Sequence, residues 1–120
     1  MAYEVEFTDE FGAWFERDLD ASEQKSVARV VDMLEQAGPN LPFPLSSGSS
    51  GISGSRYTHM RELRIQHEGR PYRVLYAFDP RRAAMLLLGG DKTGDDRWYE
   101  KMVPKADALY ERHLRQIAKE

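Results

Sequence analysis

The chain has 120 residues, of which 41% are hydrophobic and 31% are charged, as in one soluble globular domain. It contains no cysteine, which excludes disulfide frameworks, thiolate nucleophiles and cysteine-bound zinc. No apolar run approaches the ~20 residues needed to cross a bilayer, and the acidic N-terminus lacks the basic and apolar regions of a signal peptide. We therefore expect a single domain over residues 1–120 in the cytoplasm, with no membrane partner.

Charge is unevenly distributed along the chain. Residues 1–36 carry ten acidic and three basic side chains, a net charge of -7, whereas residues 56–82 carry seven arginines against three acidic side chains, a net charge of +4. An acidic protein with one arginine-rich segment can direct that segment at an anionic partner. The use of arginine throughout this segment, without lysine, favours planar and bidentate pairing with phosphate.

The first third of the chain predicts a strand followed by two helices. Residues 3–7 alternate apolar and acidic side chains, which is typical of a half-buried strand. Thr8 or Asp9 should cap a short helix with an aromatic stripe that packs in the core. Asp20 and Glu23 form an acidic version of a capping box for a second helix, which should end at Gly38-Pro39.

An uncharged segment then leads to three predicted strands. Nine of the ten residues from Ser46 to Ser55 are Ser or Gly, a composition that predicts a flexible loop. The strands should lie at about His59–Gln66, Tyr72–Asp79 and Ala83–Gly90. Because their connections are short, we expect an antiparallel meander.

The C-terminal third predicts helices. One should run from Asp95 or Asp96 to about Val103, and Pro104 should begin another, where its missing N–H costs nothing. His113 lies on the apolar face of that last helix and is more often a hydrogen-bonded structural histidine at such a position. The resulting order, β-α-α-β-β-β-α, is that of an α+β fold with a small antiparallel sheet, an N-terminal two-helix hairpin and a C-terminal helix.

Arginines inside two predicted strands are the candidate functional residues. Side chains alternate between the two faces of a strand, so neighbouring antiparallel strands can place Arg64 and Arg73 on a common face with Glu62 close by. Lys92 and Tyr99 follow the third strand. Arginines can stabilise a pentacoordinate phosphate while a Glu, Lys or Tyr moves the proton, so this set suits phosphodiester cleavage without a metal. The alternative is that the arginines are ordinary solvated positions on an open sheet face.

Other chemistries have weaker support in the sequence. The three histidines lie on different elements without metal-ligand spacing, so we expect no metal and no cofactor. No Ser-His-Asp arrangement is indicated, and the Ser/Gly segment lacks the Gly-Lys-Ser/Thr ending of a phosphate-binding loop.

The segments HMRELRIQHEGRPYRVLYAFDP and AAMLLLGGDKTGDDRWYE resemble the RelE/ParE toxin superfamily, and most closely its phage-derived HigB-type branch. The pieces M-R-E-L-R, Y-R-V-L-Y and L-L-L-G-G-D-K, in this order and spacing, carry the resemblance. It implies a small antiparallel sheet with helices packed on one face. It also implies a toxin of a type II toxin–antitoxin system that cleaves mRNA on the ribosome without a metal.

The resemblance assigns roles to individual residues. Arg73, in Y-R-V-L-Y, looks like the arginine that stabilises the transition-state phosphate, and Arg64 occupies a position similar to a basic residue that binds phosphate or assists proton transfer. Lys92 and Tyr99 resemble the basic and tyrosine positions near the C-terminal end of such sites. Glu62 is the candidate base on geometry alone. Further contacts to RNA are expected from three other arginines: Arg56, Arg61 and Arg70.

Two other functions stay open at this point. A ParE-like toxin on the same fold would bind a protein target such as DNA gyrase and cleave nothing, and an inactive module would use its arginines for partner recognition. The expected partners are mRNA on the ribosome and a cognate antitoxin, of helix-turn-helix type. The antitoxin should bring acidic residues to the arginine face or to the C-terminal helix, and the acidic helical hairpin is the alternative surface.

Overall fold

Four strands form one sheet in the spatial order β1-β4-β3-β2. The computed structural model describes residues 2–47 and 51–120. Strands β2 (Arg61–His67), β3 (Arg70–Phe78) and β4 (Ala84–Asp91) form the predicted antiparallel meander. Strand β1 (Val5–Phe7) pairs with β4 in parallel, so the sheet is mixed and not wholly antiparallel. A parallel pair needs a long connection, which the intervening helices and strands provide.

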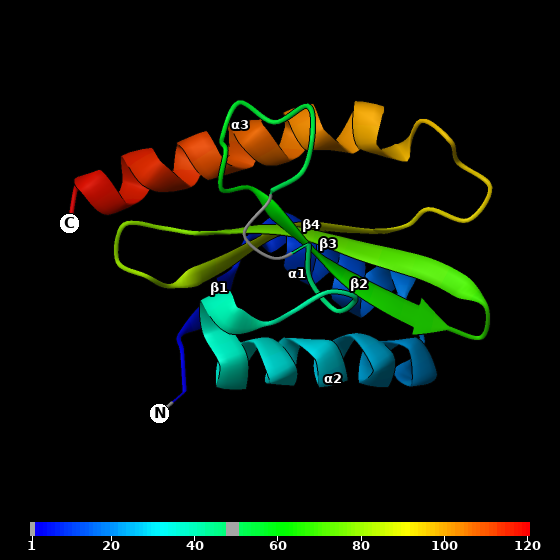
Figure 1. Cartoon of the computed structure of the whole chain (residues 1–120). Coiled ribbons are helices and arrows are strands. Elements are labelled where there is room, and N and C mark those ends of the chain that lie inside the picture. The colour runs from blue at the N-terminus through cyan, green and yellow to red at the C-terminus, as the bar shows by residue number, and fades with distance from the viewer. Residues whose placement is uncertain (1, 48–50) are drawn as a thin grey trace.

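Helices cover both faces of this sheet, whereas the resemblance implied helices on one face. Figure 1 shows α2 (Ala21–Ala37) on one side and α3 (Trp98–Ala118) on the other. The reason is the central strand β3, in which Tyr72, Val74 and Tyr76 are buried on the α2 side while Leu75 and Ala77 are buried on the α3 side. A strand that is apolar on both sides must be covered on both.

The N-terminal caps predicted from the sequence are present. The Thr8 side chain accepts a hydrogen bond from the Phe11 N–H at 3.0 Å and opens α1 (Asp9–Ala13), which continues as the π-helical segment η1 (Trp14–Asp18). Asp20 and Glu23 form the capping box of α2. Helix α2 ends at Gly38, which adopts a φ of 57° and begins the 3-10 segment η2 (Gly38–Asn40).

The C-terminal region is one helix, so the prediction that Pro104 begins a new helix was wrong. Helix α3 runs without a break from Trp98 to Ala118, with Pro104 inside it and exposed to solvent. Pro104 removes one backbone hydrogen bond. The burial of Trp98, Val103 and Tyr110 along one continuous face against the sheet compensates for that loss. In the described residues, 2–47 and 51–120, no helix has the length and apolarity to cross a membrane.

The Ser/Gly segment packs at both of its ends. Ser46 is fully buried, and its hydroxyl lies 2.8 Å from the Tyr76 hydroxyl. At the other end, the Ser55 hydroxyl donates to Asp107 at 2.5 Å. The expectation of a flexible loop over residues 46–55 therefore does not hold for these serines, because each hydroxyl finds a polar partner on the folded core. Residues 48–50 lie outside the described part of the chain.

Two consecutive glycines in β4 let tryptophans approach the sheet on opposite faces. A Cβ added at Gly89 would lie 2.2 Å from the Trp14 ring, and one added at Gly90 would lie 2.7 Å from Trp98. Trp98 is buried and forms the first residue of α3. The Gly-Gly pair therefore fixes where α3 begins relative to the sheet, and this places Tyr99 over the strands.

Candidate functional site

Arg64 and Arg73 face each other across β2 and β3. A two-residue turn joins the strands, and its residues, Glu68 and Gly69, both have positive φ (50° and 78°). This turn geometry fixes the pairing of His67 with Arg70 and, three steps further along each strand, that of Arg64 with Arg73. The sequence-based prediction that the two arginines share a face is confirmed.

Glu62 is the centre of the polar contacts on this face. Its Oε1 lies 3.3 Å from Arg73 Nε and accepts a hydrogen bond of 2.5 Å from the Tyr99 hydroxyl. Its Oε2 lies 3.7 Å from a terminal nitrogen of Arg64. Glu62 and Arg73 are both buried, at 7% and 5% exposure. These arginines are therefore held by specific partners, and the alternative of ordinary solvated positions fails for Arg73.

Arg73 is held rigidly by three groups. One of its terminal nitrogens donates to the Tyr72 carbonyl at 2.9 Å, and its Nε donates to the Tyr99 hydroxyl at 3.2 Å beside the Glu62 contact. An arginine fixed in this way loses little further conformational freedom when it binds an anion. Arg64 and Arg73 both line a cleft of about 380 Å³, whose other walls come from α2 and residues 44–45. Arg73 is thus a buried residue that also lines a cleft.

Tyr99 joins the start of α3 to the sheet. Burial raises the pKa of Tyr99 above its usual value, and the hydrogen bond to the Glu62 carboxylate raises it further. The hydroxyl therefore stays protonated at neutral pH and acts as a donor. Lys92 Nζ lies 5.6 Å from the centre of the Tyr99 ring, a cation–π distance. All five predicted catalytic residues therefore lie in one cluster: Glu62, Arg64, Arg73, Lys92 and Tyr99.

The three other arginines predicted to contact RNA are dispersed. Arg56 pairs with Glu111 of α3 at 2.7 Å. Arg61 donates to the Pro39 carbonyl at 3.2 Å, on the opposite face of β2. Arg70 pairs with Glu23 of α2 at 3.1 Å. Arg61 and Arg70 point to the opposite face of the sheet from Arg64 and Arg73, and all three have partners outside the cluster. Their contact with RNA therefore stays a prediction.

One further residue, Phe43, lies beside Arg64. The Phe43 ring is 70% exposed and lies 5.3 Å from the guanidinium carbon of Arg64. Sequence reasoning did not select it. The available signal was an aromatic residue between two prolines in an uncharged connection, which indicates a ring held by a stiff backbone. Exposed aromatic rings beside arginines are common where proteins stack single-stranded bases.

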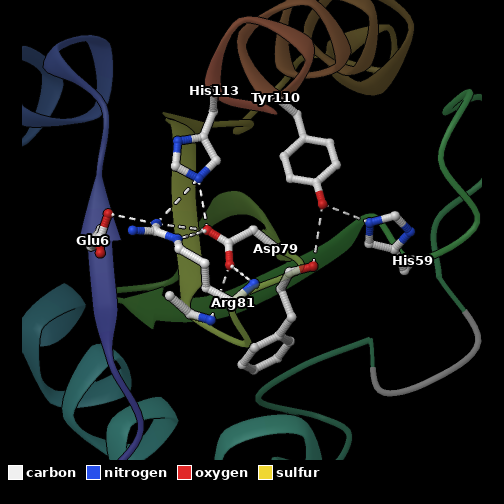
Figure 2. A network of polar contacts seen from close by, with 8 residues as sticks. Glu6, His59, Asp79, Arg81, Tyr110 and His113 are labelled. Atoms are coloured by element: carbon white, nitrogen blue, oxygen red, sulfur yellow. Dashed lines mark hydrogen bonds and ion pairs between the residues drawn. The ribbon is translucent and has the colours of Figure 1, made fainter. Parts of the chain in front are cut away.

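A second polar cluster lies at the other end of β3 and connects it to α3 (Figure 2). The buried Asp79 carboxylate lies 2.8 Å from His113 Nε2 and 2.7 Å from a terminal nitrogen of Arg81, which also pairs with Glu6 at 2.9 Å. His113 is thus a hydrogen-bonded structural histidine, as expected from its helical face. Among residues 2–47 and 51–120, no group of three His, Cys, Asp or Glu side chains could hold a metal ion.

The mixed four-stranded sheet with helices on both faces places the chain in the fold class of the toxin RelE. The solved structure of a mutant of the Escherichia coli toxin RelE in the free state superposes with a TM-score of 0.55 over 83% of this chain and 94% of that chain, at 14% sequence identity. At such low identity the match establishes the fold.

The family follows from the sequence comparison. The model of the phage-derived Gp49-like family (DUF891) matches residues 14–111, and the chain belongs to this family. Two similar relatives are candidate toxins of Mycobacterium tuberculosis: HigB2, at 36% identity over 91% of this chain, and HigB3, at 41% identity over 80% of it. The chain spans about half of HigB2 (53%) and 81% of HigB3. The resemblance to the HigB-type branch of the RelE/ParE superfamily is confirmed.

Proposed function

We propose that this chain is the toxin of a type II toxin–antitoxin system and that it cleaves mRNA on translating ribosomes without a metal ion. The single observation that carries the proposal is the geometry of Arg73. This buried arginine lies beside Arg64, Glu62 and Tyr99 and is one of the residues that line a cleft. The names of the similar relatives, HigB2 and HigB3, support the toxin role.

The proposed reaction is transesterification within the RNA. The 2′-oxygen of the substrate loses its proton to the Glu62 carboxylate and attacks the adjacent phosphorus. The bond from phosphorus to the 5′-oxygen then breaks, which leaves a 2′,3′-cyclic phosphate on one product and a 5′-hydroxyl on the other. Arg73 stabilises the charge that builds on the phosphoryl oxygens, which a preorganised donor does well because it needs no reorganisation during the reaction. The more exposed Arg64 binds a phosphate of the RNA.

Lys92 and Tyr99 complete the assignment. The leaving 5′-oxygen takes a proton from the Lys92 ammonium, which is the one cation of the cluster that can give up a proton, since arginine cannot. Tyr99 keeps its own proton, because its pKa is raised, and its hydroxyl orients Glu62. Tyr99 is thus a positioning residue, whereas Glu62, Arg73 and Lys92 contact the reacting groups and Arg64 holds the RNA.

A ParE-like toxin, which binds a protein target without cleaving RNA, would not need the same arrangement of residues. A toxin that only binds a protein target has no need for a rigid guanidinium that lines a cleft and lies beside a carboxylate and a protonated tyrosine. The ion pair between Arg73 and Glu62, with its Tyr99 hydrogen bond, therefore favours the nuclease.

Cleavage of mRNA by purified translating ribosomes tests the proposal. The wild-type chain is expected to cut mRNA without added divalent ions beyond those that ribosomes require, and to leave 2′,3′-cyclic phosphate and 5′-hydroxyl ends. The Arg73→Ala variant should lose ~10²–10³ in rate. Arg97→Ala is the matched control, because Arg97 is exposed and, among residues 2–47 and 51–120, its side chain pairs with Glu100, three residues along the chain, at 2.8 Å.

The outcomes separate the candidate functions. Equal cleavage by the wild type and a folded Arg73→Ala variant would show that Arg73 is not part of the active site. Product ends with a 3′-hydroxyl would show that the 2′-oxygen is not the nucleophile. Growth arrest on expression without any mRNA cleavage, together with inhibition of DNA gyrase, would establish the ParE-like function in place of the nuclease.

A further inference from the structure

A second groove lies on the α2 side of the sheet, away from the arginine cluster. It encloses about 330 Å³ and lies between β1, the α1–η1 segment and α2. Its lining shares no residue with the cleft that contains Arg64 and Arg73. The groove is therefore separate from the candidate active site.

Three phenylalanines form the apolar floor of the groove. The Phe7 and Phe11 ring centres are 5.8 Å apart, and those of Phe11 and Phe15 are 6.0 Å apart, so the rings follow one another as a ladder. Phe7 comes from the edge strand β1 and is 61% exposed. An exposed phenylalanine on a sheet edge, continuous with further apolar surface, is typical of an interaction site.

The wall opposite the ladder is one stripe of α2. Ala28, Val31, Asp32 and Glu35 line the groove at the spacing i, i+3, i+4, i+7, which places them on one helical face. At 1.5 Å per residue, this stripe is about 10 Å long, or two helical turns. The groove thus lies between two helical segments and matches the length of a short helix.

The rim of the groove carries uncompensated negative charge. Its carboxylates belong to Glu16, Asp32 and Glu35. Within the described part of the chain, none of these three forms an ion pair, whereas Glu10, Glu23 and Asp79 all pair with arginines. Asp32 and Glu16 are exposed to solvent. An apolar floor with an acidic rim is complementary to a surface that is apolar in the middle and basic at its edges.

We propose that this groove docks an amphipathic helix of a partner protein, with apolar side chains against the phenylalanine ladder and Lys or Arg side chains against the rim. The apolar residues of the occupant would recur at i, i+3 or i+4, and i+7, the usual anchors of a helix bound in a groove. The groove favours a helix over an added strand, because β1 has only three residues and offers a very short edge.

The groove and the arginine cluster can be occupied independently of each other. A protein docked here leaves Arg64 and Arg73 uncovered, and its charge is basic at the contact. The charge distribution along the sequence instead predicts an acidic partner on the arginine face or on the C-terminal helix. The groove corresponds to the alternative surface, the acidic helical hairpin, and it supplies an apolar contact that the sequence pattern alone did not reveal.

A designed peptide tests the proposal directly. The probe is a 14-residue helical peptide with leucines at i, i+4, i+7 and i+11 and lysines on both flanks of that stripe, measured by fluorescence anisotropy against the whole chain. We expect binding that weakens at least tenfold as the Debye length falls from ~30 Å at 0.01 M salt to ~8 Å at 0.15 M. A scrambled peptide of the same composition and a peptide with glutamates in place of lysines should both bind at least tenfold more weakly.

Matched variants locate the contact. Phe7→Ser and the triple charge reversal Glu16→Lys/Asp32→Lys/Glu35→Lys should each weaken binding tenfold or more. Phe43→Ser, which alters another exposed phenylalanine, and the equally charged triple variant Glu68→Lys/Asp96→Lys/Glu120→Lys should bind as the wild type does. Arg73→Ala should also bind normally, so loss of the proposed cleavage and loss of docking are distinguishable.

Several results would overturn the proposal. These are absence of binding, equal binding of the scrambled or the glutamate peptide, and unchanged binding by the groove variants. Concentration-dependent dimerisation of the chain alone, abolished by Phe7→Ser, would assign the groove to a second copy in place of a partner helix.

Discussion

Arg64 and Arg73 are direct cross-strand partners, but their side chains differ sharply in exposure, at 33% and 6%. Arg73 is fixed by the Tyr72 carbonyl and Tyr99, whereas Arg64 reaches past Glu62 toward the exposed Phe43 ring. From this difference we infer separate roles in the proposed reaction. The rigid Arg73 stabilises the reacting phosphate, and the exposed Arg64 helps to hold the RNA.

Substitution of the two arginines should therefore affect different kinetic constants. Arg73→Ala removes a preorganised donor and should lower kcat by ~10²–10³ with little change in KM. Arg64→Ala removes an exposed phosphate contact and should mainly raise KM, by roughly tenfold, with a smaller salt dependence. The measurement is the rate of mRNA cleavage on translating ribosomes as a function of ribosome concentration.

A positive charge at position 73 should not be sufficient for full activity. Arg73→Lys keeps the charge but loses the planar fork and should remain impaired in kcat, whereas Arg64→Lys should be nearly wild type. Full activity of Arg73→Lys would show that any cation suffices there and that the geometry around Tyr99 is incidental.

Tyr99→Phe tests the orientation of Glu62. The variant keeps the ring and its contact with Lys92 but removes the hydroxyl that donates to Glu62 at 2.5 Å. We expect kcat to fall about 10- to 100-fold with KM unchanged, because a misplaced catalytic group costs rate and not binding. Since the pKa of Tyr99 is raised above its usual 10, its ionisation should not limit wild-type activity between pH 6 and 9.

A matched tyrosine provides the control for that experiment. Tyr3→Phe alters a tyrosine that packs near Gly38, far along the chain from the cluster, and should leave both kinetic constants unchanged. If Tyr99→Phe raised KM and left kcat intact, Tyr99 would contact the RNA and would not position Glu62.

The sequence was sufficient to predict features that depend on short-range rules. The caps at Thr8 and Asp20 follow from local side-chain chemistry. The pairing of Arg64 with Arg73 follows from the two-residue turn at Glu68-Gly69, because the turn fixes the register of both strands.

Features that depend on distant packing could not be predicted in the same way. Arg73 donates a hydrogen bond to Tyr99, which lies at the start of α3. The position of Tyr99 depends in turn on the packing of its neighbour Trp98 against Gly90. The continuity of α3 through Pro104 depends on a buried face that outweighs a local stop signal. The parallel pairing of β1 with β4 joins residues about 80 positions apart, for which the strand pattern gives no partner.

Gly89→Ala should be strongly destabilising. The added Cβ would lie 2.2 Å from the Trp14 ring, too close for any real contact, so the ring or the strand must move. Overpacking of this kind costs about 3 kcal/mol. The measurement is the free energy of unfolding in urea. In a Trp14→Ala background the same glycine substitution should cost much less, and an equal cost in both backgrounds would mean that Trp14 is not the cause.

Asp79→Asn should weaken the junction between β3 and α3 in a way that depends on pH. Burial opposes ionisation of Asp79, but hydrogen bonds from Arg81, His113 and the backbone outweigh it and hold the pKa of Asp79 below its usual value. Because the folded pKa is depressed, the ionised carboxylate stabilises the fold above the unfolded pKa of about 4, and this contribution is lost as pH falls through the folded value.

Urea unfolding of wild type and Asp79→Asn across pH 7 to 3 measures this effect. At pH 7 the variant should be less stable by about 2 kcal/mol, the scale of a hydrogen bond to a charged group. The difference should stay constant down to about pH 5 and shrink below pH 4, where the wild-type carboxylate becomes protonated too. Asp96→Asn, at an exposed position, is the control and should change stability little at any pH. A difference that stayed constant or grew down to pH 3 would mean that ionisation of Asp79 does not supply this stability.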